Sequence, residues 1–418
     1  MQTQYKTIIL LLISIISAGL AQGLSIIAIP WYFTDNLNQS SFFSLGYGII
    51  TFFGLFWGLY AGVMIDNFNR KKILLYINLC CACVFGGIYI YFKFINGHSP
   101  IIILLGFGAC SLYYMIFFPN LYAITQELTN KKDYVKVNSL IELFIQTISI
   151  IAATICGLLL AGGEEFVNYF NLSFLEFKKW DIRNLFLLNS ILYLITFTLL
   201  MFVDYQPRKN LSNHNLQKTL QDIREAVSFL IGKKNILIYG VASQIVFAFL
   251  IVELFSLLPI FVKNCLNENV ITFSLADVTY GFGALIAGLI TTKTLKKSNK
   301  IDFTILLIMT AGYSFFLMIK FPNLNMFFAS TFIIGVVNAS IRITRMSYFF
   351  DTIPNNLIGR INTIFNSVNT LIRGVLILIF SMTWFAEGSN VIMGYKIGIY
   401  ILILFTLPLM LMKKQKLN

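Results

Sequence analysis

Charged residues are scarce in this chain, which has 418 residues. Asp, Glu, Lys and Arg make up only 12% of it, whereas 57% of the residues are apolar and the mean hydropathy is +0.78. Such a composition does not supply enough polar side chains to cover a soluble globule. It therefore excludes a soluble protein and predicts that lipid is the main solvent of the folded chain.

Acidic residues are fewer than basic ones, 18 against 31, which gives a formal net charge of +13. In a soluble protein this excess of cations would indicate a nucleic-acid partner. Here the cations are spread through short loops between apolar runs, so we interpret them as signals of membrane topology. We expect no nucleic acid to bind.

Cysteine and histidine, the usual ligands of zinc, are also rare, with six and two copies. Cys80, Cys81 and Cys83 crowd one turn of an apolar run, where no tetrahedral cage can form and no histidine is near. We expect these cysteines to pack in the interior. The sequence predicts no metal site.

Motifs of nucleotide binding and catalysis are missing. The stretch Gly281-Phe-Gly283 continues into an apolar run and does not form a phosphate-binding loop, and no accessible loop pairs a nucleophile with a base. We therefore expect no cofactor and no enzymatic activity. An ion gradient, not ATP, would drive any transport.

Apolar runs long enough to cross a bilayer dominate the rest of the chain. A spanning helix needs about 20 mostly apolar residues. Twelve runs meet this requirement, which predicts an all-α membrane protein with both termini on one side. The predicted spans are 6–32, 42–65, 73–95, 100–126, 137–161, 183–203, 235–262, 274–294, 301–320, 323–350, 361–386 and 391–412.

The distribution of Lys and Arg supports this number of spans. When the loops are assigned to alternate sides, 21 basic residues fall on the side of the termini and seven on the other. The positive-inside rule makes the richer side cytoplasmic. We expect a multi-pass protein of the bacterial cytoplasmic membrane with both termini in the cytoplasm.

The two halves of the chain resemble each other. A shift of 224 residues places Glu127 on Asp351 and Lys136 on Arg360, and a shift of 229 places Pro30 on Pro259. Transporters are often built from such repeats, with the substrate site between them. We predict two six-helix halves, residues 1–203 and 235–418.

Residues 204–234, between the halves, are more polar. Leu216, Leu220, Ile223, Val227 and Leu230 recur at spacings of four and three, which predicts an amphipathic helix. Flanking cations could reach the lipid headgroups, so this helix could lie on the cytoplasmic leaflet. The alternative is a plain linker that continues into the seventh span.

The loop after the second span reads Gly62-Val-Met-Ile-Asp66-Asn-Phe-Asn69-Arg70-Lys71-Lys72. It resembles the G-x-x-x-D-x-x-G-R-R/K signature of the major facilitator superfamily. Asn69 replaces the usual Gly, and Asn is the next most tolerant residue of a left-handed turn. The resemblance implies the major facilitator fold and a gate at Gly62, Asp66, Arg70 and Lys71.

Three shorter stretches resemble the branch of macrolide-efflux proteins and the enterobactin exporter. Two features of the archetypal drug/proton antiporters are absent: the fourth span, 100–126, has no Arg, and the fifth span lacks a Gly-Pro pair. The resemblance implies efflux, in drug resistance or in siderophore export, whereas proton antiport does not follow from it. The stretches are Ile29-Pro30-Trp31, Phe118-Pro119-Asn120 and Gly359-Arg360.

Three arginines lie inside predicted spans, where a charge costs at least about 2.5 kcal/mol at the helix centre. Arg373 is near the middle of the eleventh span, and Arg342 and Arg345 share one face of the tenth. Guanidinium groups bind carboxylates through paired hydrogen bonds, so we predict a site for an anionic substrate. The alternative is that Arg342 and Arg345 reach the inner interface or brace the gate.

Glu253 lies deeper within a predicted span than any other carboxylate of the chain, and we predict that it couples transport to protons. The alternative is a structural ion pair with an arginine. Glu142, one turn into the fifth span, is a candidate gate residue. Tyr113 and Tyr114 are candidates for lining the substrate cavity.

The leading hypothesis is a monomeric secondary transporter that exports a small amphiphilic anion, such as a carboxylate siderophore, by alternating access. Its partners would be this small molecule, membrane lipid and protons. The alternatives are a macrolide or multidrug efflux pump, nutrient uptake, and lipid flipping.

Overall fold

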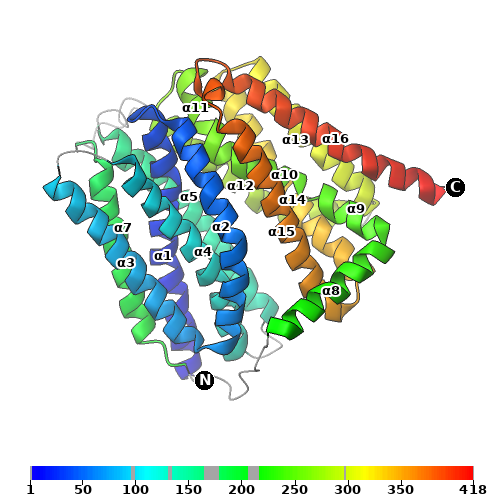
Figure 1. Ribbon diagram of the computed structural model, residues 1–418, viewed down its shortest axis with the longest axis horizontal. Coiled ribbons are helices and arrows are strands. Elements are labelled where there is room, and N and C mark those ends of the chain that lie inside the picture. Colours follow the sequence, from blue (N-terminus) through cyan, green and yellow to red (C-terminus); the bar gives the residue numbers. More distant parts are fainter. Residues whose placement is uncertain are drawn as a thin grey trace. The chain divides into compact units, whose positions relative to one another are not determined.

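The computed structural model describes residues 2–95, 99–129, 134–163, 178–205, 216–295 and 298–417. Within these residues the chain is helical and has no strand (Figure 1). The elements are α1 (Gln2–Asp35), α2 (Ser40–Asn67), α3 (Arg70–Phe94), α4 (Pro100–Leu128), α5 (Tyr134–Ala161), α7 (Ile182–Met201), α8 (Leu216–Gly232), α9 (Lys234–Ala242), α10 (Ile245–Val252), η2 (Glu253–Leu257), α11 (Leu258–Asn264), α12 (Val270–Leu295), α13 (Lys300–Lys320), α14 (Leu324–Thr352), α15 (Asn355–Phe380), η3 (Thr383–Ala386) and α16 (Val391–Leu417).

Twelve helices in the described part are long and apolar enough to cross a membrane, which confirms the predicted number of spans. The seventh span is composite, because α9, α10, the π-helical segment η2 and α11 follow one another from Lys234 to Asn264. The eleventh span ends at Phe380, before the predicted 386, because a turn and the short 3-10 helix η3 follow it.

Asparagine side chains cap the N-termini of three of these helices. Asn69 caps α3 by accepting a hydrogen bond from the Lys72 backbone N–H at 3.1 Å, and Asn299 and Asn323 cap α13 and α14 in the same way. Such caps satisfy backbone donors that have no partner within the helix. The φ angle of Asn69 is −62°, so Asn replaces the Gly of the motif as a helix cap, and the predicted left-handed turn is wrong.

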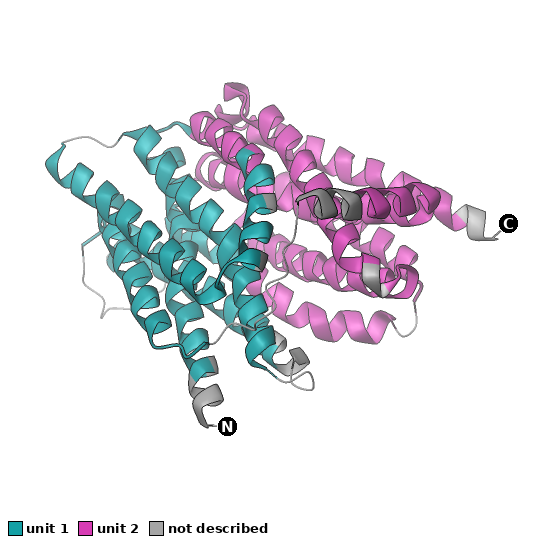
Figure 2. Ribbon diagram, turned by 60° about the horizontal axis from the view of Figure 1, so that its bottom comes forward, with its two compact units in different colours: residues 1–39, 53–214, 269–278 teal, residues 40–52, 215–268, 279–418 magenta. Residues whose placement is uncertain are grey.

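The chain forms two compact units (Figure 2). Unit 1 contains residues 1–39, 53–214 and 269–278, and unit 2 contains residues 40–52, 215–268 and 279–418. The first turns of α2 therefore group with unit 2, and the first turns of α12 with unit 1. The predicted division at 203 and 235 stays a prediction.

In unit 1, α1 packs on α5 and α7, and α3 packs on α4 and α7. Hydrogen bonds between neutral side chains tie these helices together, including Ser17 with Thr196 at 2.7 Å and Asn189 Nδ2 to Ser25 Oγ at 2.8 Å. Cys81 is buried as predicted, but Cys80 and Cys83 are exposed on the surface of α3. Two of the three clustered cysteines therefore do not pack in the interior.

In unit 2, α13 packs on α14 and α16, and α10 packs on α15. The helix α8 lies beside the start of α15 (Figure 1), where Arg360 forms an ion pair with Glu225 at 2.6 Å. Ala226 and Leu230 of α8 are buried, whereas Val227 and Ile231 are exposed. A helix therefore exists where the amphipathic pattern predicts one; the side chains of Leu216, Leu220 and Ile223 lie outside the described residues.

Candidate functional site

The seventh span is interrupted between α9 and α10. Ser243 and Gln244 form a turn at this point, and both residues are buried. An interruption of a helix frees backbone carbonyls to accept hydrogen bonds from other elements. The carbonyl oxygen of Ser243 accepts one from Nη1 of Arg345 at 3.1 Å.

Arg345 of α14 is a buried charged residue, with only 8% of its surface exposed. Its Nη1 also donates to Oε1 of Gln244 at 2.9 Å, while its Nε is buried without an acceptor. Within the described part of the chain it forms no ion pair. A buried ion without a counter-ion costs several kcal/mol, so Arg345 is an unfavourable charge in this conformation.

The helix α15 extends this network. Asn369 is 3% exposed, and its Nδ2 donates to the Gln244 carbonyl oxygen at 3.1 Å. Arg373 follows one turn later, partly buried; its Nη2 donates to Thr370 Oγ1 at 3.0 Å and its Nε is buried without an acceptor. Gln244 and Asn369 thus connect Arg345 to α15, and Arg373 lies one turn further along that helix.

The other predicted lining residues lie elsewhere. Arg342 is exposed on α14, outside this network. Tyr113 is buried in unit 1, where its hydroxyl donates to Asn78 Oδ1 at 3.0 Å, and Tyr114 is half exposed with its ring 4.9 Å from that of Phe118. Substrate contacts of these three residues stay predictions.

Glu253 begins the π-helical segment η2 and is 6% exposed. Its Oε1 accepts a hydrogen bond from the Tyr395 hydroxyl of α16 at 2.7 Å. Among the described residues it has no ion pair, and its role stays a prediction. π-Helical segments inside α-helices are frequent at functional sites.

The loop between the second and third spans is held by Arg70. Its Nη1 lies 3.0 Å from Oε1 of Glu127, near the end of α4, and donates to the Ala123 carbonyl oxygen at 2.9 Å. The Tyr205 hydroxyl, after α7, also donates to Glu127, and Asn120 Nδ2 donates to the Arg70 carbonyl oxygen at 2.8 Å. Arg70 therefore joins the start of α3 to the end of α4, and Glu127 extends this contact to the segment after α7.

The other predicted gate residues are less tightly connected. Lys71 Nζ donates to the carbonyl oxygen of Met201, at the end of α7, at 2.9 Å, and Glu142 accepts from the Tyr122 hydroxyl at 2.8 Å. A Cβ atom at Gly62 would meet nothing within 4 Å, so no helix of the described part packs closely against this glycine. The side chain of Asp66 lies outside the described residues.

Unit 2 repeats the arrangement around Arg70. Lys300, at the start of α13, pairs with Asp351 near the end of α14 and donates to the Ser347 carbonyl oxygen at 3.0 Å. In both units the carbonyl acceptor precedes the acid by four residues, and a capping Asn precedes the cation. These contacts support the repeat that the sequence predicts between Glu127 and Asp351.

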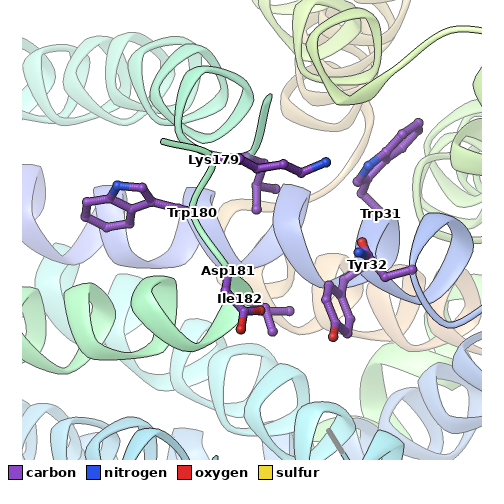
Figure 3. Close-up of a pocket in the computed structure, with 8 residues that line it drawn as sticks. Trp31, Tyr32, Lys179, Trp180, Asp181 and Ile182 are labelled. Carbon is purple, nitrogen blue, oxygen red and sulfur yellow. The ribbon is translucent and has the colours of Figure 1, made fainter. Parts of the chain in front are cut away.

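A separate pocket of about 300 Å³ lies in unit 1, at the end of α1 and before α7 (Figure 3). Trp31 and Tyr32 line it from α1, opposite the stretch Lys179–Ile182. None of the predicted substrate or gate residues contributes to it.

Comparison with known families identifies the scaffold. The family model of the Major Facilitator Superfamily matches residues 11–377. The chain belongs to the major facilitator superfamily. As a multi-pass member of this superfamily, it is a transporter of the membrane. No curated protein matches the chain in sequence.

Solved structures of other major facilitators share the fold of this one at low identity. A variant of the nucleoside transporter NupG superposes with a TM-score of 0.74 and 13% identity, covering 98% of this chain and 99% of NupG. A bacterial homologue of the human lysosomal transporter Spinster gives 0.69 and 14%, with 97% and 96% covered, and a D-xylose-proton symporter gives 0.68 and 15%, with 96% and 97% covered. At these identities the likeness shows the fold alone.

Sequence reasoning missed three members of the two buried clusters: Gln244, Asn369 and Tyr395. Gln244 and Asn369 have polar amide side chains within apolar runs, and this contrast is the sequence signal that marks them. Tyr395 is one of 20 tyrosines, and no sequence feature separates it from the rest.

Proposed function

We propose that this major facilitator is a secondary active efflux transporter of a small amphiphilic anion, such as a carboxylate siderophore. One observation carries the proposal: Arg345 is buried, has no carboxylate partner in the described part, and is linked through Gln244 and Asn369 to the helix of Arg373. A negatively charged substrate would supply the missing counter-ion.

Efflux as the direction of transport rests on the resemblance of three short stretches to macrolide-efflux proteins and the enterobactin exporter. Alternating access is the mechanism that two repeated halves make possible. Glu253 is our candidate for the proton-coupling group. It is buried, and the hydrogen-bond donor to its carboxylate is the uncharged hydroxyl of Tyr395.

A second candidate function is efflux of cationic or neutral drugs such as macrolides. Aromatic rings surround the partner of Glu253: the ring of Tyr395 lies 5.2 Å from Phe261 and 5.7 Å from Phe315. A buried carboxylate among aromatic rings suits a cationic amphiphile. In that case the arginines would have a structural role.

The deciding experiment is export by cells that produce the wild type, Arg373→Ala or Glu253→Gln at matched abundance. We expect the wild type to export a carboxylate siderophore, and Arg373→Ala to lose this export. Export of a macrolide by the wild type, unchanged in Arg373→Ala and without siderophore export, would contradict the anion proposal and favour the drug pump.

A further inference from the structure

Gln244 is held in one orientation by its neighbours. Its Oε1 accepts from Arg345 Nη1 at 2.9 Å and lies 3.5 Å from Nδ2 of Asn369. The amide nitrogen, Nε2, is buried and has no acceptor. An amide whose oxygen is engaged on both sides therefore presents a free N–H donor inside unit 2.

Arg345 also keeps one edge of its guanidinium free. Nη1 is occupied by the Ser243 carbonyl oxygen and the Gln244 Oε1, whereas Nε is buried without an acceptor and no hydrogen bond leaves Nη2 in the described part. The Nε and Nη2 groups form the side of a guanidinium that binds two oxygens in parallel.

The unsatisfied atoms of this network are all donors. Arg345 Nε, Gln244 Nε2 and Arg373 Nε are each buried without an acceptor. A buried donor left unpaired is unfavourable, and one that carries charge more so. Water could accept these hydrogen bonds but could not neutralise the buried Arg345 guanidinium, so the missing partner needs acceptor oxygens and a negative charge.

We propose that Gln244 and Arg345 together bind a carboxylate group of the substrate, which bridges the Nε edge of Arg345 and the Nε2 amide of Gln244. Arg373 lies one turn along α15 from Asn369, which holds the Gln244 backbone. This inference rests on the proposed transport of an anion and adds Gln244 as the residue that determines which anion is accepted.

Carboxylate fits these donors better than phosphate. One flat guanidinium edge and one amide N–H match two coplanar oxygens, whereas a phosphate monoester brings three oxygens and a larger charge. Carboxylate and phosphate are both oxyanions, so the test includes one probe of each kind.

The test uses the full chain purified in detergent, with thermal unfolding measured against phenylacetate, phenyl phosphate and benzyl alcohol. We expect phenylacetate to raise the unfolding temperature of the wild type in a saturable way and benzyl alcohol to leave it unchanged. A rise with phenyl phosphate alone would overturn the assignment to a carboxylate. No rise with any anion would contradict the proposed anion transport itself.

Gln244→Glu is the decisive variant, because it places a carboxylate of the protein on Arg345. We expect it to unfold at a higher temperature than the wild type without ligand and to lose the response to phenylacetate. Gln22→Glu, at a buried glutamine of unit 1, is the matched control, which should unfold at a lower temperature because it gains a buried carboxylate with no cation.

Gln244→Leu covers the case in which the Glu variant does not fold. It removes the amide donor, and we expect it to weaken phenylacetate binding at least tenfold while any response to phenyl phosphate changes less. If phenylacetate stabilises either Gln244 variant as strongly as the wild type, Gln244 is not part of the site, and the anion proposal stands without it.

Discussion

At the scale of single residues, the buried carboxylate of Glu253 has an unusual environment. The hydroxyl of Tyr395, at 2.7 Å, is the hydrogen-bond donor that the structure gives it, and no cation balances its charge in the described part. A carboxylate in such a site can accept a proton without breaking an ion pair. Proton binding there would change the charge of unit 2 during transport.

We predict that Glu253→Gln separates transport from the proton gradient. The amide keeps the shape and can still accept the Tyr395 hydrogen bond, but it cannot exchange a proton. In proteoliposomes we expect accumulation driven by a pH gradient to be lost, while exchange of labelled for unlabelled substrate continues. Tyr395→Phe is the control, which should retain gradient-driven transport at a lower rate; full gradient-driven transport by Glu253→Gln would refute the role.

Cys265, which follows α11 outside the membrane spans, gives a prediction with a defined pH dependence. Burial raises the pKa of its thiol to about 11. Because the thiolate is the reacting form, roughly one molecule in a thousand is reactive at pH 8, and this fraction rises about tenfold per pH unit. We expect a membrane-impermeant thiol reagent to label Cys265 slowly at pH 7 and progressively faster up to pH 9, with Cys265→Ser as the blank. Fast labelling that does not depend on pH would contradict the burial.

The sequence reveals charged site residues more readily than neutral ones. Arg345, Arg373 and Glu253 stand out because a charge within an apolar run is expensive and needs a reason. Gln244 and Asn369 cost much less to insert, so their positions carry little signal until the fold places them against Arg345. Even for charged residues, spacing does not predict burial. It places Arg342 on the same helix face as Arg345, yet Arg342 is exposed and Arg345 is buried.

At the scale of helices, the two cation–acid contacts of the repeat differ in burial. The side chains of Arg70 and Glu127 are each 19% exposed, whereas Asp351 is 62% exposed beside Lys300. We expect Glu127→Gln to lower the free energy of unfolding by about 1–2 kcal/mol and Asp351→Asn by less than about 1 kcal/mol. Thermal unfolding of the purified variants measures both, and a larger loss for Asp351→Asn would reverse the argument.

The crossing of α12 and α14 depends on two glycines. A Cβ at Gly335 would lie 2.1 Å from the Tyr280 carbonyl oxygen, and one at Gly283 would lie 2.1 Å from that of Phe332. Backbone atoms cannot move aside easily, so we expect either Gly→Ala change to cost about 1–3 kcal/mol. Gly288→Ala is the matched control on α12, because a Cβ there meets nothing within 4 Å. Equal unfolding temperatures for Gly335→Ala and Gly288→Ala would show that these helices do not cross so closely.

Length and hydropathy predict the helices of this protein well, because spanning a bilayer requires one long apolar run per helix. They do not predict the interruption at Ser243 and Gln244 or the π-helical segment at Glu253. Ser243 and Gln244 are neither Gly nor Pro, the usual markers of a broken helix, whereas Pro259 marks the π-helical segment because it cannot donate a backbone hydrogen bond to residue 255. At the interruption, side chains of α14 and α15 bond to the backbone carbonyls of Ser243 and Gln244, and these contacts cannot be read from one apolar run.

At the scale of the whole molecule, buried charge is distributed unequally between the two units. The polar groups that join the spans of unit 1 are mostly neutral, such as the hydroxyl of Tyr113 with the amide of Asn78. Arg345 and Glu253, the charged residues of the described part that are less than 9% exposed, both belong to unit 2, whereas in unit 1 the partly buried Arg70 and Glu127 pair with each other. Sequence repeats predict two similar halves, but from this difference in charge we propose that unit 2 recognises the charge of the substrate.

This proposed division of tasks predicts that a substitution in unit 2 changes substrate selectivity, whereas one in unit 1 does not. Arg373→Gln removes a charge from unit 2, so we expect it to raise the KM for a carboxylate substrate at least tenfold and to leave that for an uncharged analogue nearly unchanged. Tyr113→Phe removes one buried hydrogen bond from unit 1, so we expect a loss of stability of about 1 kcal/mol and similar KM values for both substrates. Uptake into inverted membrane vesicles, normalised to protein abundance, provides the comparison. If Tyr113→Phe discriminates between the two substrates as strongly as Arg373→Gln, then unit 1 also contacts the charged group, and recognition is shared between the halves.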